Sequence, residues 1–166
     1  MSIRMNGTMH LDQRDHEILA LVQKDAKMPQ AEIGRRVGLS TASVNERLRK
    51  LEQAGVIRRY TALVDPQAVG ASLVAFIEVS IEHPRFEPAL IEHVRGLEAV
   101  QECHHITGEF SLLLKVRVRD MLGLREMLLN QLNAREGVRQ TRTIMVLESV
   151  KEDPTVVTAA KGVPVL

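Results

Sequence analysis

Residues 30–55 read Gln30-Ala-Glu-Ile-Gly-Arg-Arg-Val-Gly-Leu-Ser-Thr-Ala-Ser-Val-Asn-Glu-Arg-Leu-Arg-Lys-Leu-Glu-Gln-Ala-Gly55. Two short helical patterns meet in this stretch at Gly38-Leu39-Ser40. A glycine suits the left-handed backbone just past a helix end, and a serine hydroxyl caps the first turn of the next helix. Leu39 between them is suited to plug a small core. A helix, a tight glycine-containing turn and a second helix form the helix-turn-helix pattern.

The second helix of this pattern is amphipathic. Val44, Leu48 and Leu51 share one face at helical spacing, so we expect them to be buried. The other flanks carry hydroxyls, an amide and positive charge, which suit base edges and phosphates in the major groove of duplex DNA. An ordinary solvated helix carries similar residues. The Gly-Leu-Ser turn and the charge of the flanking sequence favour the DNA interpretation.

Positive charge is concentrated around this helix. The 166-residue chain has a net charge of +1, but residues 1–65 hold 11 Lys and Arg against 8 Asp and Glu. Residues 35–59 hold seven basic and two acidic side chains, which is typical of a phosphate-binding surface. Aromatic residues make up only 2% of the chain, which argues against base stacking and therefore against RNA or single-stranded DNA.

Length and composition indicate a globular protein of one or two domains. No apolar run approaches the length of a membrane span, and residues 1–10 lack the apolar core of a signal peptide. Cys103 is the single cysteine, so an internal disulfide is excluded. These features predict a cytoplasmic protein.

We expect the DNA-binding domain to span residues 1–65. Its first ten residues read as a polar tail, and Asp12 is a good N-cap for a first helix. Pro29 suits the start of the second helix. Residues 56–64 are rich in β-forming side chains and predict a strand or wing, and residues 56–70 together form the linking strand and hinge.

The remaining residues, 66–166, predict a second domain with alternating and helical patterns. Strands are expected over 73–81, 100–107, 110–118 and 138–150, with one helix around 86–94 and another that starts at Asp120. The order is βαββαβ, a ferredoxin-like arrangement, so the fold class is α+β. Because both helices cover one face of such a sheet, the other face stays open, and pairing of two subunits is the simplest way to cover it.

Several short motifs occur in a specific order along nearly the whole chain. They are Leu11-Asp12 with Asp15 and Ile18-Leu19, Arg36-Val-Gly-Leu-Ser40, Arg47-Leu-Arg-Lys-Leu-Glu52, Gly55-Val-Ile57, Tyr60-Thr-Ala-Leu63, Gln101-Glu-Cys-His104, Gly108-Glu-Phe110, Leu114-Lys115 and Thr141-Arg-Thr143. In these motifs the chain resembles the Lrp/AsnC family, the feast/famine transcription regulators.

The resemblance implies a winged helix-turn-helix head joined to a βαββαβ ligand-sensing domain. It also implies dimers that assemble into octamers, and an amino-acid effector bound between dimers, without any other cofactor. The family's loop between the second and third strands reads Gly-Asp-Tyr/Phe-Asp, whereas this chain has Gly108-Glu-Phe-Ser111. The final acid, a suitable partner for a ligand ammonium group, is therefore replaced by Ser111.

These arguments define two sets of candidate site residues. The DNA-binding set is Arg36, Ser40, Thr41, Ser43, Asn45, Arg47, Arg49, Lys50, Arg58 and Arg59. Within it, we expect Arg47 to read bases, so that Arg47→Ala weakens specific binding far more than non-specific binding. The effector set is Thr107, Gly108, Glu109, Phe110, Ser111, Thr141 and Thr143. Taken without the resemblance, Gly108 makes an ordinary hairpin turn and the threonines follow β-propensity.

Other functions are less well supported by the sequence. Glu102 and Cys103-His104-His105 suggest a metal, but neighbouring strand residues point to opposite faces and nothing completes a tetrahedral ligand set, so we expect no metal site. No phosphate loop or nucleophile-base motif is present, so an enzyme is not expected. The alternative that remains open is an oligomeric small-molecule-binding module whose helical head contacts other proteins.

Overall fold

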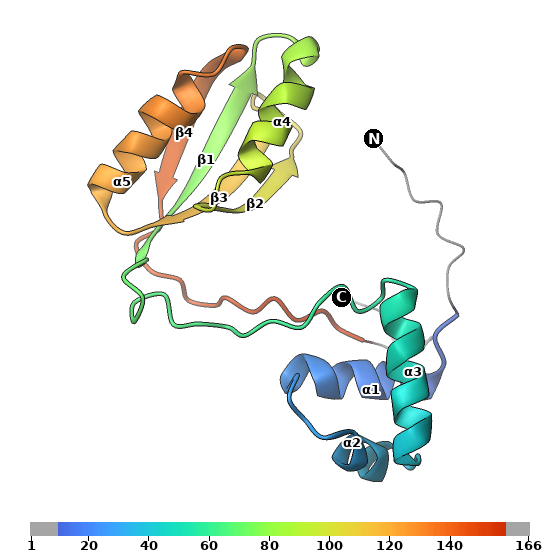
Figure 1. Cartoon of the computed structure of the whole chain (residues 1–166). Helices are drawn as coiled ribbons and strands as arrows, with labels where there is room; N and C mark the ends of the chain where they lie inside the picture. The colour runs from blue at the N-terminus through green and yellow to red at the C-terminus, as the bar shows by residue number, and fades with distance from the viewer. Residues whose placement is uncertain (1–9, 159–166) are drawn as a thin grey trace. The chain divides into compact units, whose positions relative to one another are not determined.

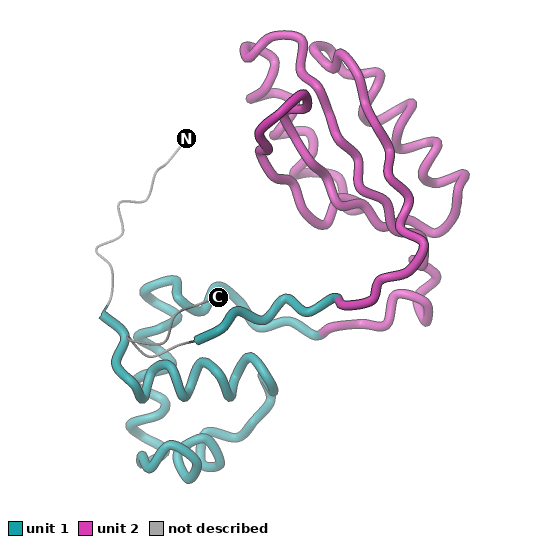
Figure 2. Tube along the Cα trace, turned by 180° about the vertical axis from the view of Figure 1, so that it is seen from behind, with its two compact units in different colours: residues 1–62, 152–166 teal, residues 63–151 magenta. Residues whose placement is uncertain are grey.

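The computed structural model describes residues 10–158, so most of the tail expected over residues 1–10 lies outside the described residues. The described chain divides into two compact units (Figure 2). The first contains residues 10–62 together with 152–158, and the second contains residues 63–151. The sequence predicted a single domain boundary between residues 65 and 66. In the structure the first boundary falls after residue 62, and residues 152–158 belong to the first unit.

Three helices form the body of the first unit: α1 (Gln13–Lys24), α2 (Gln30–Val37) and α3 (Thr41–Gln53) (Figure 1). Asp12 caps α1 as expected, in a reciprocal capping box with Asp15. The three apolar faces meet in one core, whose buried members are Ile18, Leu19, Val22, Ile33, Val37, Val44, Leu48 and Leu51. This confirms the buried face predicted for α3.

The turn between α2 and α3 has the predicted backbone. Gly38 ends α2 in the left-handed region at φ 69°, and the Ser40 side chain accepts a hydrogen bond from the Ser43 amide. A second glycine matters as much and was not singled out from the sequence. Gly34 is buried, and a Cβ built on it would lie 2.5 Å from the Leu39 carbonyl oxygen. The turn therefore folds back directly onto the backbone of α2.

The strand expected over residues 56–64 is not formed. Residues 56 and 57 form a bend whose amides donate to the Leu51 carbonyl, and no strand is assigned to residues 56–64. A strand requires a neighbouring strand for its backbone hydrogen bonds, and β-propensity alone does not supply one. From the other end of the chain, Val156 binds α1 by two hydrogen bonds with the Gln23 side-chain amide, at 2.8 and 3.1 Å.

The second unit is a four-stranded antiparallel sheet in the order β2-β3-β1-β4. Its elements follow the chain as β1 (Leu73–Ile81), η1 (Pro84–Phe86), α4 (Glu87–Arg95), β2 (Val100–His105), β3 (Leu112–Val118), α5 (Met121–Glu126), η2 (Met127–Asn133) and β4 (Val138–Met145). This is the predicted βαββαβ arrangement. Asp120 caps α5 as expected, and the helix then continues as the π-helical turn η2.

One face of the sheet is covered by the helices α4 and α5 (Figure 1). Ala75, Ile77 and Val79 of β1 lie in this core, with Leu90 and Leu124 from the two helices. The alternating residues of β1 therefore point to the open face, as predicted. β4 is shorter than predicted, because its partner β1 begins at Leu73 and residues beyond 146 have no strand beside them. β3 likewise begins at residue 112, two residues later than predicted.

None of the helices within residues 10–158 has both the length and the apolar character that crossing a membrane requires.

Candidate nucleic-acid interface and effector loop

The exposed face of α3 is mostly polar. Thr41, Asn45, Glu46, Arg49 and Lys50 are all exposed on it together with Ala42, whereas Val44, Leu48 and Leu51 face the core. Hydroxyl, amide, carboxylate and cationic groups thus lie in adjacent turns of one helix. This combination offers donors and acceptors to base edges and positive charge to phosphates.

Ser40 and Ser43, both predicted to contact DNA, lie at the start of this face. The Ser43 amide donates to the Ser40 hydroxyl at 3.1 Å, and the two hydroxyl oxygens lie 2.9 Å apart. Both residues are exposed. The Ser40 hydroxyl therefore caps α3, and the Ser43 hydroxyl is its side-chain partner.

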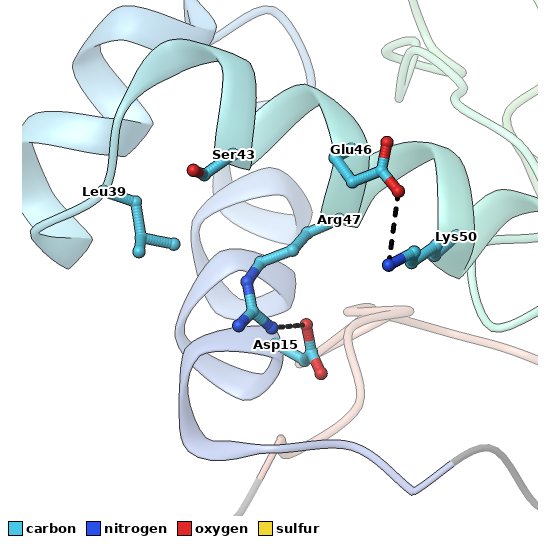
Figure 3. Close-up of a pocket in the computed structure, with 6 residues that line it drawn as sticks. All are labelled: Asp15, Leu39, Ser43, Glu46, Arg47 and Lys50. Carbon is cyan, nitrogen blue, oxygen red and sulfur yellow. Dashed lines mark hydrogen bonds and ion pairs between the residues drawn. The ribbon is translucent and has the colours of Figure 1, made fainter.

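Arg47 lies differently from the sequence-based expectation. Its Nη1 donates to Asp12 Oδ2 at 2.8 Å and to Asp15 Oδ1 at 2.7 Å, so the guanidinium points toward α1 (Figure 3). The Asp15 side chain is only 6% exposed and that of Arg47 is 29% exposed. In this structure the Arg47 side chain joins α3 to α1, and its expected contact with bases stays a prediction.

The pKa values of Asp12 and Arg47 are both shifted at this bridge. The pKa of Asp12 is lowered, first by the hydrogen bond from the Asp15 amide and then by Arg47. The pKa of Arg47 is raised, first by its hydrogen bond to Asp15 and then by that to Asp12. One cation thus holds two carboxylates, of which the Asp15 carboxylate is withdrawn from solvent.

Several other cations of the head form ion pairs on the surface. Glu32 binds both Arg35 and Arg36 at 2.7 Å, and these hydrogen bonds lower the pKa of Glu32 to about 2. Arg49 and Lys50 share Glu46, each at 3.2 Å. Exposed ion pairs of this kind add little stability because solvent screens them, so a phosphate group can take over the cation at little cost.

Arg58 and Arg59 complete the predicted phosphate-binding set. Both follow α3 in the segment of residues 56–64, and both are exposed. Glu46 was not predicted as a site residue, yet it lies on the same face as Arg49 and Lys50. Its spacing of three and four residues before these two cations is the signal that identifies it in the sequence.

A shallow hollow of about 400 Å³ runs along the flank of α3 (Figure 3). It is lined by Asp15, Leu39, Ser43, Glu46, Arg47 and Lys50. Figure 3 shows Arg47 crossing it toward Asp15, while Lys50 pairs with Glu46 at its rim. The Arg47 bridge therefore lies across this hollow and joins α3 to the start of α1.

The predicted effector loop, residues 106–111, connects β2 and β3. The Ile106 amide donates to the Ser111 carbonyl at 3.1 Å, and the Ser111 amide donates to the Val79 carbonyl at 2.9 Å. Gly108 has φ 122°, and a Cβ built on it meets nothing within 4 Å. Phe110 is only 4% exposed. The loop thus combines a buried anchor with an accessible glycine backbone.

The structure does not bring the whole predicted effector set together. Thr141 and Thr143 pair with Val79 and Ile77, which belong to the helix-covered face. Residues directly opposite each other in an antiparallel pair lie on the same face. The Thr141 hydroxyl donates to Asn133 Oδ1 at 3.0 Å, in η2. Within one chain, the two threonines therefore face the helices, whereas the loop makes its contact with Arg142 on the open face.

Two residues that contact members of the predicted effector set were missed by the sequence analysis. Asn133 binds Thr141, as described above. Arg142 lies over the Phe110 ring, 4.8 Å from its centroid, and pairs with Glu78. The alternation of β4 gives a signal for Arg142, because it must point away from Thr141 and Thr143. Among the described residues, no His, Cys, Asp and Glu side chains gather as a metal site would require.

A basic helix-turn-helix head followed by an antiparallel βαββαβ sheet defines a DNA-binding protein with an added small-molecule domain. Comparison with known families agrees with this class. Residues 11–58 match the model described as winged helix-turn-helix DNA-binding, and residues 74–156 match the model described as the Lrp/AsnC ligand binding domain.

Individual relatives extend over most of the chain. It is 42% identical over 146 residues to the leucine-responsive regulatory protein of Escherichia coli strain K12, covering 86% of this chain and 88% of that protein. A transcriptional regulator from Neisseria meningitidis, solved as its complex with L-Met, has a TM-score of 0.84 and 32% identity over 89% of this chain and 96% of its own. The chain belongs to the Lrp/AsnC family of transcriptional regulators, which are DNA-binding proteins and not enzymes.

Proposed function

We propose that this regulator binds duplex DNA through the exposed face of α3, and that its second unit senses an amino acid. The observation that carries the DNA proposal is the polar face of α3, which holds Thr41, Asn45 and Arg49 opposite a fully apolar face. A regulator of this kind acts where the genome is, so we assign it to the cytoplasm. In the alternative, a head that contacts only proteins, there is no need for the hydroxyl, amide and guanidinium groups of Thr41, Asn45 and Arg49 to lie together.

The proposed DNA contacts divide into two kinds. Thr41, Asn45 and Arg49 reach base edges, and Arg36, Lys50, Arg58 and Arg59 bind phosphates, which set register without reading sequence. Ser40 and Ser43 hold the start of α3 against the DNA backbone. For a two-fold dimer, the two half-sites lie about 34–36 Å apart or at a multiple of that spacing.

The test is fluorescence anisotropy of the purified protein with the DNA upstream of its own gene and with scrambled DNA, at two salt concentrations. Binding is expected to weaken with salt, because phosphate contacts release counterions. Asn45→Ala is expected to lower affinity for the native DNA by roughly 5- to 100-fold, since a good bidentate contact to a base is worth about 1–3 kcal/mol. Affinity for scrambled DNA is expected to change little.

Gln67→Ala is the matched control, because it removes an exposed amide outside the head. Equal losses on both DNAs would remove Asn45 from base readout. Binding to neither DNA at either salt concentration would favour the alternative, in which the head contacts proteins.

The effector proposal rests on the loop of residues 106–111. A free amino acid carries a carboxylate, which backbone amides can hold where no side chain blocks them. The open space around Gly108 provides such an approach, and Glu109 supplies an exposed carboxylate for the ammonium group. The relative from Neisseria meningitidis was solved with L-Met, which supports an amino acid as the effector class.

Ser111→Asp is expected to strengthen amino-acid binding, because it restores an acid opposite the ligand ammonium group. A hydrogen bond to a charged group is worth about 1.5–3 kcal/mol, so the gain is roughly 10- to 100-fold in affinity. Calorimetry with each of the twenty amino acids measures it. Ser111→Asn is the control, since it has the same shape without the charge. Absence of binding by all three proteins would contradict a pocket at this loop.

We further propose that the open face of the sheet pairs two copies of the chain, and that such dimers assemble into a larger oligomer such as an octamer. Two rows of side chains cross this face: His104, Leu113, Glu78 and Arg142, and then Glu102, Lys115, Phe76 and Ile144. Ile144 is 46% exposed, so pairing would bury it. Sedimentation that shows only monomer at every concentration would contradict this assembly.

A further inference from the structure

Arg142 occupies a particular position on the open face of the sheet. It lies opposite Glu78 in the pairing of β1 with β4. The neighbours of Glu78 in β1, Ile77 and Val79, are completely buried under the helices. Glu78 and Arg142 must therefore point to the other side, toward the face that we assign to subunit pairing.

The guanidinium of Arg142 makes two different contacts at once. Its Nε donates to Glu78 Oε2, and Glu78 is only 13% exposed. Its guanidinium carbon also lies over the ring of Phe110, 4.8 Å from the ring centroid. The carboxylate of Glu109, next in the loop, adds a third attraction to the same cation.

Phe110 is the anchor of the effector loop, and Arg142 is part of its cover. The ring is 4% exposed, yet Phe110 does not belong to the core cluster beneath the helices. An aromatic ring stacked by an arginine is protected from water and electrostatically stabilised in the same contact. Loss of this cover would free the residue that holds the loop against the sheet.

We propose that Arg142 is a positioning residue that fastens the effector loop, residues 106–111, to the open face of the sheet. Arginine suits this role because its planar, forked group can bind a carboxylate and stack on a ring together, which a lysine ammonium cannot do. This inference rests on the proposed function, since it deepens the assignment of the loop to an amino acid and of the face to subunit pairing.

The effector loop and the face assigned to subunit pairing share Arg142, so amino-acid binding and subunit pairing are coupled. If an amino acid shifts the loop, it shifts Phe110 and hence the Arg142–Glu78 pair, which lies in the pairing face. Coupling between two binding equilibria is reciprocal: the factor by which the amino acid changes subunit affinity equals the factor by which pairing changes amino-acid affinity. Typical couplings of this kind are about 5- to 150-fold.

The test compares the full-length chain with Arg142→Gln, Arg142→Lys and the control Arg139→Gln, which removes the same charge from an exposed position of the same strand. Amide hydrogen exchange of residues 107–111 is measured first, without any ligand. Exchange is expected to become roughly tenfold faster or more in both Arg142 variants, the factor for about 1.4 kcal/mol of lost protection. The Arg139 variant is expected to match the wild type.

The second measurement is the subunit dissociation constant by sedimentation, with and without a saturating amino acid found by calorimetry. A ligand effect in the wild type that disappears in Arg142→Gln and persists in Arg139→Gln would support the coupling. Unchanged exchange in the Arg142 variants would overturn the positioning role. A wild type that binds no amino acid would overturn the effector assignment and the coupling, while the exchange result would still decide the positioning role.

Discussion

Replacing Arg47 with alanine is expected to destabilise the head by about 2–3 kcal/mol. Removing one partner of a buried ion pair costs about 3–5 kcal/mol, because the remaining charge has no compensation. We expect a cost at or below the lower end of that range, because the Arg47 side chain is 29% exposed although that of Asp15 is only 6% exposed. The capping box of Asp12 and Asp15 does not replace the lost cation.

Urea unfolding of the purified variant measures this effect. Arg49→Ala is the matched control, because it removes an arginine two positions away in α3 that is 56% exposed and bound only to surface partners. Its expected change in stability is below about 0.5 kcal/mol. Equal stability of the two variants would contradict the structural role of Arg47. An Arg47→Ala protein of normal stability that loses only specific DNA binding would return this residue to base readout.

Gly34→Ala is expected to destabilise the head by about 1–2 kcal/mol, although alanine is the better helix former. The helical preference of alanine over glycine is worth about 1 kcal/mol. Against it, the new Cβ would lie 2.5 Å from the Leu39 carbonyl oxygen. Because that atom belongs to the backbone of the turn, the turn must move, and overpacking of this kind costs about 1–3 kcal/mol or more.

Gly123→Ala is the control for this prediction. Gly123 also lies in a helix, but its added Cβ would meet Val118 and Asp120 only at 3.6 and 3.7 Å, which are ordinary contact distances. The control is therefore expected to keep or raise the stability of the second unit. Thermal unfolding reports both variants. A Gly34→Ala protein as stable as the wild type would show that the turn accommodates a side chain.

Local patterns predicted most of the fold, because they depend on neighbouring residues. The spacing of Val44, Leu48 and Leu51 identified the buried face of α3, and Gly38 and Ser40 marked the turn. The strand predicted over residues 56–64 was wrong because it depends on a distant residue pattern. A strand needs a partner segment, and the sequence of one segment does not reveal whether that partner exists.

The site was predicted less completely, because its key contacts join distant residues. Arg47 and Asp15 are separated by 32 positions, so local patterns describe each residue only within its own helix. Nothing local shows that these two polar residues meet. Thr141 and Thr143 were grouped with the loop because the register of β4 against β1 was not known, and the register decides which face each residue takes.

The first unit is built from two pieces of chain, and this affects how it is made. During synthesis, residues 10–62 leave the ribosome before the second unit does, and N-terminal segments generally fold first. The hydrogen bonds between Gln23 and Val156 join residues 133 positions apart. The helix-turn-helix core can therefore form early, but its last contact must wait until the entire sheet has been translated. The DNA-binding head is therefore complete only after the sensing domain has been synthesised.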